Sequence, residues 1–240
     1  RLTLRSSGLA PAWHLARFPV WYIIRPAGQA PHRCSPLSSN VRPHTRLLMP
    51  GFTAKPLSAD TWPDFAALVE RHNGVWGGCW CMEFHPEGKE RGAHRRGQKE
   101  LRVREGTAHA ALVYDGATCV GWCQFGPPDE LPRIKHLRVY SQEQGTPPDW
   151  RITCFFVDKE HRGKGVAAAA LAGALHEIAR LGGGTVESYP EDTVDRRVSA
   201  SFLYNSRLAM FEHQGFQRVR RLGRNHWVVS RQVLASRGEA

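Results

Sequence analysis

Residues 151–189 read RITCFFVDKEHRGKGVAAAALAGALHEIARLGGGTVESY, and this stretch carries the strongest structural signal in the chain. Its first seven residues are rich in β-branched and aromatic side chains and indicate a buried strand. A helix is expected to run to about Leu181, because alanine and leucine recur on one face. Three glycines at 182–184 end that helix, and residues 185–189 form the next, parallel strand. This order of elements predicts an α/β fold.

The turn between that strand and helix is suited to binding a diphosphate. Gly163 and Gly165 have no side chains, so a phosphate can approach their backbone N–H groups. These groups lie at the start of a helix, where the helix dipole supplies about half a positive charge. Arg162 and Lys164 add mobile cations. Taken alone, the turn could also be an ordinary helix start. It matches neither the P-loop nor the three-glycine Rossmann pattern.

The residues before this stretch continue the α/β order. The expected elements are strands at 52–57, 110–114 and 118–125, and helices from Ser58 or Asp60 to about His72 and over 89–105. Asp115-Gly116 between two apolar runs predicts a hairpin. Residues 126–149 contain five prolines and are expected to form a long loop.

Several motifs resemble the GNAT acetyltransferase family. Arg162-Gly-Lys-Gly-Val-Ala167 is similar to its R/Q-x-x-G-x-G/A signature, and Phe211-Glu-His-Gln-Gly215-Phe216 is similar to its Y-E-x-x-G-F. The strand, the Ala/Leu helix and these motifs occur in family order. Residues 52–232 therefore resemble one GNAT domain, a mixed central sheet flanked by helices, followed by a tail at 233–240. Within the family the chain resembles the branch with a G-C-W-C-M segment, here at 78–82.

The resemblance implies acetyl-CoA as cosubstrate, with no metal, and indicates where it binds. Backbone groups of Phe156 and Val157, at the end of a splayed strand, would contact the pantetheine arm and thioester. Asn205 approximately matches a family asparagine near the start of a later helix. The residues whose amides would hold the pyrophosphate are Arg162, Gly163, Lys164, Gly165, Val166 and Ala167.

The resemblance also implies direct attack of an acceptor amine on the acetyl carbonyl, with a strand N–H stabilising the oxyanion. The family's usual acid is a tyrosine, but here that position is Phe211, which cannot donate a proton. Tyr204, two turns earlier on the expected helix, is one substitute; water or unassisted departure of the thiolate are the others. Glu83, Glu187 and Tyr189 are candidate bases, acting directly or through water.

The segment 76–85 is rich in tryptophan and cysteine. Cys79, Trp80 and Cys81, together with Tyr189, are expected to line the acceptor pocket, because the loop after the first helix contacts acceptors in the family. Aromatic packing under a mobile loop is an equal alternative. A zinc site lacks a second cysteine pair at suitable spacing, and Cys81 as an acyl carrier is a more remote alternative. A basic run at 133–138 is either solvated loop or a contact for an acidic acceptor or for the 3′-phosphate of coenzyme A.

The net charge of +11 is unevenly distributed. Residues 1–48 hold seven of the 33 basic residues and none of the 22 acidic ones, leaving about +4 on the remainder. We expect 1–48 to be an extension with little packed structure, either a transit peptide or sequence upstream of a start at Met49. No apolar run reaches the roughly 20 residues of a membrane span. The aromatic residues are not interleaved with the basic runs as a nucleic-acid platform requires.

Two functions follow. The first is an acetyl-CoA-dependent N-acetyltransferase acting on a small-molecule amine or a protein amino group. The alternative, motivated by Phe211, is a non-catalytic acyl-CoA-binding regulatory or sensor domain of the same fold. Six cysteines in a chain of this length indicate reduced thiols and a cytoplasmic protein. We expect a monomer or homodimer without membrane or nucleic-acid partners.

Overall fold

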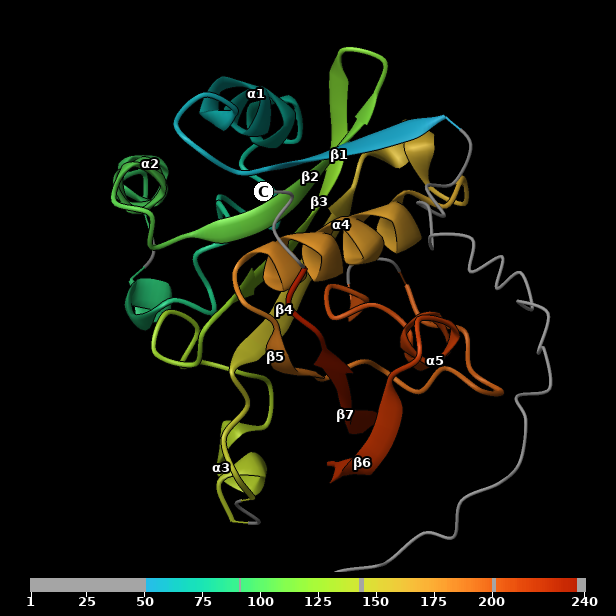
Figure 1. Ribbon diagram of the computed structural model, residues 1–240. Coiled ribbons are helices and arrows are strands. Elements are labelled where there is room, and N and C mark those ends of the chain that lie inside the picture. Colours follow the sequence, from blue (N-terminus) through green and yellow to red (C-terminus); the bar gives the residue numbers. More distant parts are fainter. Residues whose placement is uncertain (1–50, 91, 143–144, 200–201, 237–240) are drawn as a thin grey trace, which may run out of the picture. The chain divides into compact units, whose positions relative to one another are not determined.

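The computed structural model describes residues 51–236, except 91, 143–144 and 200–201. A seven-stranded sheet with strand order β1-β2-β3-β4-β5-β7-β6 forms its centre (Figure 1). All neighbouring strands are antiparallel except β4 and β5, which run parallel. This mixed sheet with flanking helices confirms the predicted α/β fold. The expected extension at 1–48 lies outside the described residues, as do 237–240 of the expected tail.

The elements lie close to their predicted positions. The strands are β1 (Phe52–Pro56), β2 (His109–Asp115), β3 (Thr118–Gly126), β4 (Trp150–Val157), β5 (Gly184–Ser188), β6 (Gln217–Leu222) and β7 (His226–Val233). The helices are α1 (Trp62–Arg71), α2 (Arg95–Arg104), α3 (Leu137–Tyr140), α4 (Val166–Arg180) and α5 (Leu208–His213), with 3₁₀ turns at Pro86–Lys89 and Lys159–His161.

Two predicted segments differ from the structure. The single helix over 89–105 is wrong: a 3₁₀ turn at Pro86–Lys89 is followed by the shorter helix α2. Gly92 lies between them with φ +149°, a conformation that a helix does not use. The expected loop at 126–149 contains the short helix α3.

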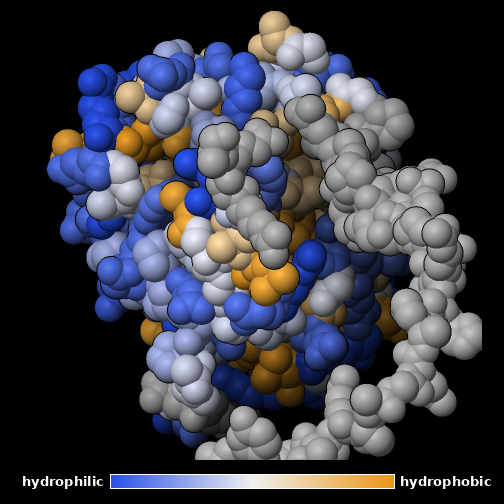
Figure 2. All heavy atoms as spheres, in the orientation of Figure 1, coloured by the Kyte–Doolittle hydropathy of each residue, from blue (hydrophilic) through white to orange (hydrophobic). Residues whose placement is uncertain are grey.

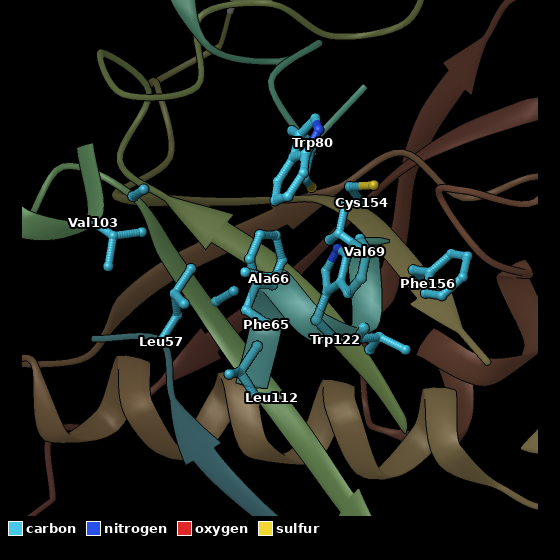
Figure 3. Close-up of a cluster of buried hydrophobic side chains, with 14 of the residues drawn as sticks. Leu57, Phe65, Ala66, Val69, Trp80, Val103, Leu112, Trp122, Cys154 and Phe156 are labelled. Carbon is cyan, nitrogen blue, oxygen red and sulfur yellow. The ribbon is translucent and has the colours of Figure 1, made fainter. Parts of the chain in front are cut away.

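The sheet has a hydrophobic core on each face. On one face α1 packs against β2 and β3, and Figure 3 shows Phe65, Trp122 and Phe156 gathered there. The Phe65 and Trp122 ring centroids are 4.9 Å apart, and Trp122 stacks on Phe156 at 4.7 Å. Each such side chain contributes about 1.5–3 kcal/mol on burial.

Helix α4 packs on the other face of the sheet together with α5. Its close approach depends on Gly173, where a Cβ would lie 2.7 Å from the Ala54 Cβ and 3.2 Å from the Ala111 Cβ. This contact holds the middle of α4 against β1 and β2. None of the described helices is long and apolar enough to cross a membrane. On the face in Figure 2, hydrophilic residues predominate and hydrophobic residues form separate patches.

Candidate active site

Strands β4 and β5 separate halfway along β4. They pair only where Trp150–Ile152 faces Val186–Ser188. Beyond this point the N–H groups of β4 alternate between β3 and the open edge, since the Asp158 N–H donates to the Val120 carbonyl at 2.8 Å. The Phe155 and Val157 amides therefore point to the open edge. The Phe155 N–H donates to the Tyr204 carbonyl at 2.7 Å, whereas that of Val157 has no backbone acceptor among the described residues.

A groove of about 870 Å³ extends from this open edge to the N-terminus of α4, and we call it the donor groove. Seven of the residues predicted to bind the cosubstrate line it, namely Phe156, Val157, Arg162, Gly163, Gly165, Val166 and Ala167. Lys164 is exposed in the same turn without lining the groove. The structure adds Arg207, which precedes α5 and was missed because the start of that helix was misplaced.

The glycine turn leaves room for a diphosphate. Gly163 and Gly165 have φ of +77° and +88°, in the left-handed region that favours glycine. A Cβ at Gly163 would meet nothing within 4 Å. The first amides of α4 have no helical partners of their own, as at the start of any helix. These residues fit a pyrophosphate.

Asp158, which directly follows β4, stabilises the chain just before the glycine turn. Its carboxylate accepts the Glu160 N–H at 3.0 Å, forms an ion pair with Arg71 at 3.1 Å and lies 3.2 Å from His72 Nε2. Burial opposes ionisation, but the hydrogen bond from Glu160 and the contacts with His72 and Arg71 hold the pKa of Asp158 well below its usual range. The turn is thus fixed to the end of α1.

A second cavity of about 370 Å³ lies beside the donor groove, and Trp76 lines both. We call it the acceptor cavity. Four residues predicted for catalysis or acceptor binding come together in it: Cys79, Cys81, Glu83 and Tyr204. The remaining lining residues are Phe84, Arg133, Ile134, Lys135 and Cys154. Sequence reasoning singled out the basic run at 133–138 without placing it beside the cysteine-rich segment.

The wall formed by 76–81 depends on a left-handed turn. Residues 73–78 all have positive φ, from +43° at Trp76 to +84° at Gly78. Gly74 is required, because a Cβ there would lie 2.7 Å from the Gly78 Cα. Val75 is β-branched, and an L-residue in this conformation costs about 1–2 kcal/mol. Burial of Val75, Trp80 and Cys81 in the core on the α1 face offsets that cost.

Tyr204 does not lie on the helix that contains Phe211, so that part of the prediction is wrong. Helix α5 begins at Leu208. The backbone at 204 instead bonds to the edge of β4, and its ring lies 6.0 Å from Phe84 and 6.3 Å from Trp76. Burial, reinforced by nearby Cys154, raises the pKa of Tyr204. Its hydroxyl therefore keeps its proton at neutral pH.

Other predicted residues lie away from both cavities. Phe211 is 0% exposed and packs edge-on against Phe155 and Phe216. The Glu187 carboxylate accepts hydrogen bonds from Tyr140 at 2.8 Å and Tyr189 at 3.3 Å.

Trp80 and Asn205 also line neither cavity. Trp80 is buried against Trp62, with ring centroids 6.1 Å apart. Asn205 Nδ2 donates to the Thr153 carbonyl at 2.7 Å behind the open edge. Both residues support the site from within the protein core.

A buried polar network supports the floor of the acceptor cavity. The Cys81 thiol donates to Gln124 Oε1 at 3.1 Å, and Gln124 Nε2 lies 2.8 Å from His85 Nε2. Lys99 Nζ is 3.0 Å from the same His85 nitrogen. Burial, with the Lys99 charge, holds the pKa of His85 well below its usual range, so the ring is neutral. Across 51–236, apart from the five undescribed positions, no three His, Cys, Asp or Glu residues are grouped to hold a metal ion.

Comparison with known proteins assigns the family. Residues 66–216 match the model of the Acetyltransferase (GNAT) family, and the chain belongs to that family. The matched region begins within α1, ends at Phe216 and includes the residues of both cavities. Acetyl-CoA is the acyl donor of this family, and this confirms the cosubstrate predicted from the sequence.

Solved structures with similar folds share little sequence with this chain. An acetyltransferase from Corynebacterium glutamicum related to histone acetyltransferase HPA2 is 16% identical, covering 79% of this chain and 99% of that one at a TM-score of 0.46. The Salmonella typhimurium protein yncA, solved with acetyl-CoA, is 14% identical over 79% and 97%, with a TM-score of 0.44.

The ribosomal-protein-S18-alanine N-acetyltransferase of Escherichia coli is 13% identical over 78% of this chain and 97% of its own, with a TM-score of 0.41. No curated protein matches the chain. The family assignment therefore rests on the family model.

Proposed function

We propose that the chain is an acetyl-CoA-dependent N-acetyltransferase that transfers the acetyl group directly to an amine of a small molecule or a protein. The observation that carries the proposal is the junction of two cavities at Trp76. One follows the glycine turn and the open edge of β4. The other holds an acid and a tyrosine that can exchange protons with the reactants.

The donor groove supplies contacts along its whole length. The amides of 162–167 bind the pyrophosphate, and Arg162 and Lys164 add charge from the exposed side of the turn. The Val157 N–H, free on the open edge, is available to the thioester carbonyl and to the oxyanion formed from it. Asn205 acts as a positioning residue, because its side chain holds the segment that carries Tyr204.

Bound acetyl-CoA supplies an acyl group with a thiolate as leaving group. Glu83 accepts a proton from the attacking amine, directly or through a water molecule. Tyr204 keeps its proton until the thiolate departs and then donates it. Because Phe211 belongs to the core, Tyr204 occupies the role that the family's usual tyrosine fills.

We further propose a cytoplasmic protein, active as a monomer or homodimer. The five cysteines that the structure describes are free thiols, which supports a reducing compartment. The aromatic rings at the site line two cavities, which supports an amine acceptor over nucleic acid.

The experiment measures acetyl-CoA binding by calorimetry and release of free thiol with a broad panel of amines, using the full chain. Gly165→Glu puts bulk and negative charge into the pyrophosphate site, and we expect a loss of affinity of at least about 100-fold. Gly182→Glu, at the other end of α4, is the matched control, since a Cβ there meets nothing within 4 Å. Equal binding by both variants would refute the assigned site. Tight binding without thiol release for any amine would favour the non-catalytic sensor domain.

A further inference from the structure

We propose that the acceptor is a small amine that also carries a carboxylate, as an α-amino acid does, and that Lys135 binds this carboxylate in the acceptor cavity. The inference rests on the proposed function, because it assigns the acceptor to this cavity. It goes further in naming the chemical class of the acceptor and the residue that selects it.

The size of the acceptor cavity suits a single small molecule. Its volume of about 370 Å³ lies near the lower end of the roughly 300–1,000 Å³ range of small-molecule sites. Trp76, Phe84 and Tyr204 form an aromatic wall, with Tyr204 within 6.0–6.3 Å of the other two rings. Such a wall accepts the apolar side chain of a small acceptor.

The charges of the cavity are not balanced. The Glu83 carboxylate lies 3.5 Å from Arg133 Nη2 and 3.6 Å from Arg95 Nη2, so two guanidinium groups already surround it. Lys135 has no carboxylate within 4 Å among the described residues. Its ammonium lies 5.5 Å from the centre of the Tyr204 ring, over the aromatic wall. The cavity therefore has an excess of positive charge at Lys135.

The surroundings of Lys135 show the same excess. Burial and the charge of Lys135 lower the pKa of His226 to about 4, so this neighbour is neutral at pH 7. Glu191, the carboxylate beside His226, is paired with Arg196 at 3.3 Å. A partly buried ammonium without a fixed anion favours an anionic ligand.

A carboxylate on the acceptor supplies this missing anion. With the carboxylate at Lys135, the amine of an α-amino acid lies in the cavity that Glu83 also lines. The negative charge of the acceptor's own carboxylate stabilises its neighbouring ammonium group. Pairing that carboxylate with Lys135 reduces this stabilisation, which lowers the pKa of the acceptor's ammonium and favours the neutral, nucleophilic amine. A protein N-terminus has no such carboxylate, so the site selects free amino acids over chain termini.

The test compares each common L-amino acid with its amide, which lacks only the carboxylate charge. Thiol release is measured with the full chain at saturating acetyl-CoA, and the same compounds are titrated calorimetrically into the protein with and without coenzyme A. We expect the acids to be preferred about 10- to 100-fold in kcat/KM and in affinity. Lys135→Met should abolish that ratio while the amides bind as before, and Lys135→Arg should retain most of it. Lys55→Met is the matched control, because Lys55 also lies over a tyrosine ring, that of Tyr114, but on β1.

The outcomes separate this inference from the proposed function. Thiol release with amines but equal use of acids and amides overturns the inference alone, as does an unchanged ratio in Lys135→Met. Failure of every acid in the panel to bind, with or without coenzyme A, also overturns it. Absence of thiol release and of acetyl-CoA binding refutes the proposed function, while the titration without coenzyme A still decides the carboxylate preference.

Discussion

Replacement of Asn205 tests how the open edge of β4 is held. Asn205 is 2% exposed, and its Nδ2 donates to the Thr153 carbonyl at 2.7 Å. One residue earlier, the Tyr204 carbonyl accepts the Phe155 N–H. The two contacts fasten the same short segment to β4 and so bring the Tyr204 ring to the acceptor cavity.

The structure sets the size of the effect. Asn205→Ala leaves the buried Thr153 carbonyl without this donor, which costs about 1–3 kcal/mol. The substitution also removes Asn205 Oδ1, which has no hydrogen-bond partner among the described residues, and so offsets part of the loss. We expect a decrease of about 1 kcal/mol in the free energy of unfolding. Asn205→Asp replaces the donor with a carboxylate oxygen facing Thr153, and we expect a loss of about 3 kcal/mol or more.

Urea unfolding of the full chain measures these losses. Asn225→Ala is the control, because the Asn225 side chain makes no hydrogen bond within the described part of the chain. The dissociation constant of acetyl-CoA should stay the same, because Asn205 lines neither cavity. The kcat should fall about tenfold if displacing Tyr204 costs about 1.4 kcal/mol in the transition state. An Asn205→Asp variant as stable as the wild type would refute the hydrogen bond. Weaker acetyl-CoA binding at unchanged kcat would instead indicate that Asn205 acts in binding the cosubstrate in the donor groove.

Three further predictions concern other contacts. Tyr204→Phe should lower kcat about 10- to 100-fold without changing the affinity for acetyl-CoA, and unchanged thiol release would remove Tyr204 as the acid. Asp158→Asn should lower the free energy of unfolding by about 1 kcal/mol at pH 7, since Arg71 is partly exposed. The pKa of Asp158 is lower in the folded state than in the unfolded chain. Asp158 therefore contributes to the free energy of unfolding at pH values above about 4, the ordinary pKa of an aspartate side chain. In urea unfolding, the difference in free energy of unfolding between wild type and Asp158→Asn should decrease as the pH falls below about 4. A difference that does not change with pH would contradict this prediction. Gly183→Ala should cost about 3 kcal/mol or more, because its Cβ would lie 2.4 Å from the Val233 carbonyl oxygen. Gly182→Ala, with open space and only an unfavourable φ, should cost about 1 kcal/mol, and equal losses would exclude the clash as the cause.

The fold could be predicted because its signals are local. Asp115-Gly116 makes the hairpin between β2 and β3, and the glycines at 163 and 165 mark the start of α4. Each of these signals acts over a few residues, so the sequence pattern contains it directly. The helix predicted over 89–105 was wrong because a single Gly92 interrupts a pattern that otherwise favours helix.

The acceptor cavity could be predicted only in part. Its lining comes from four segments, residues 76–84, residues 133–135, Cys154 of β4 and Tyr204. The cysteine-rich segment stood out by composition, but nothing local links it to Lys135. Tyr204 was expected on the helix that contains Phe211, two turns earlier on the same face. That expectation missed the hydrogen bond from the Phe155 N–H to the Tyr204 carbonyl, which joins positions 49 apart in the sequence and leaves no local pattern.

The left-handed turn at 73–78 has a consequence for how this protein can diverge. The residues that hold the turn, such as Val75 and Trp80, are also core residues, so their replacement lowers stability as well as changing the cavity wall. Lys135 lines the acceptor cavity without belonging to that hydrophobic core. New acceptor preferences are therefore expected to evolve, or to be engineered, through Lys135, while the aromatic wall is retained.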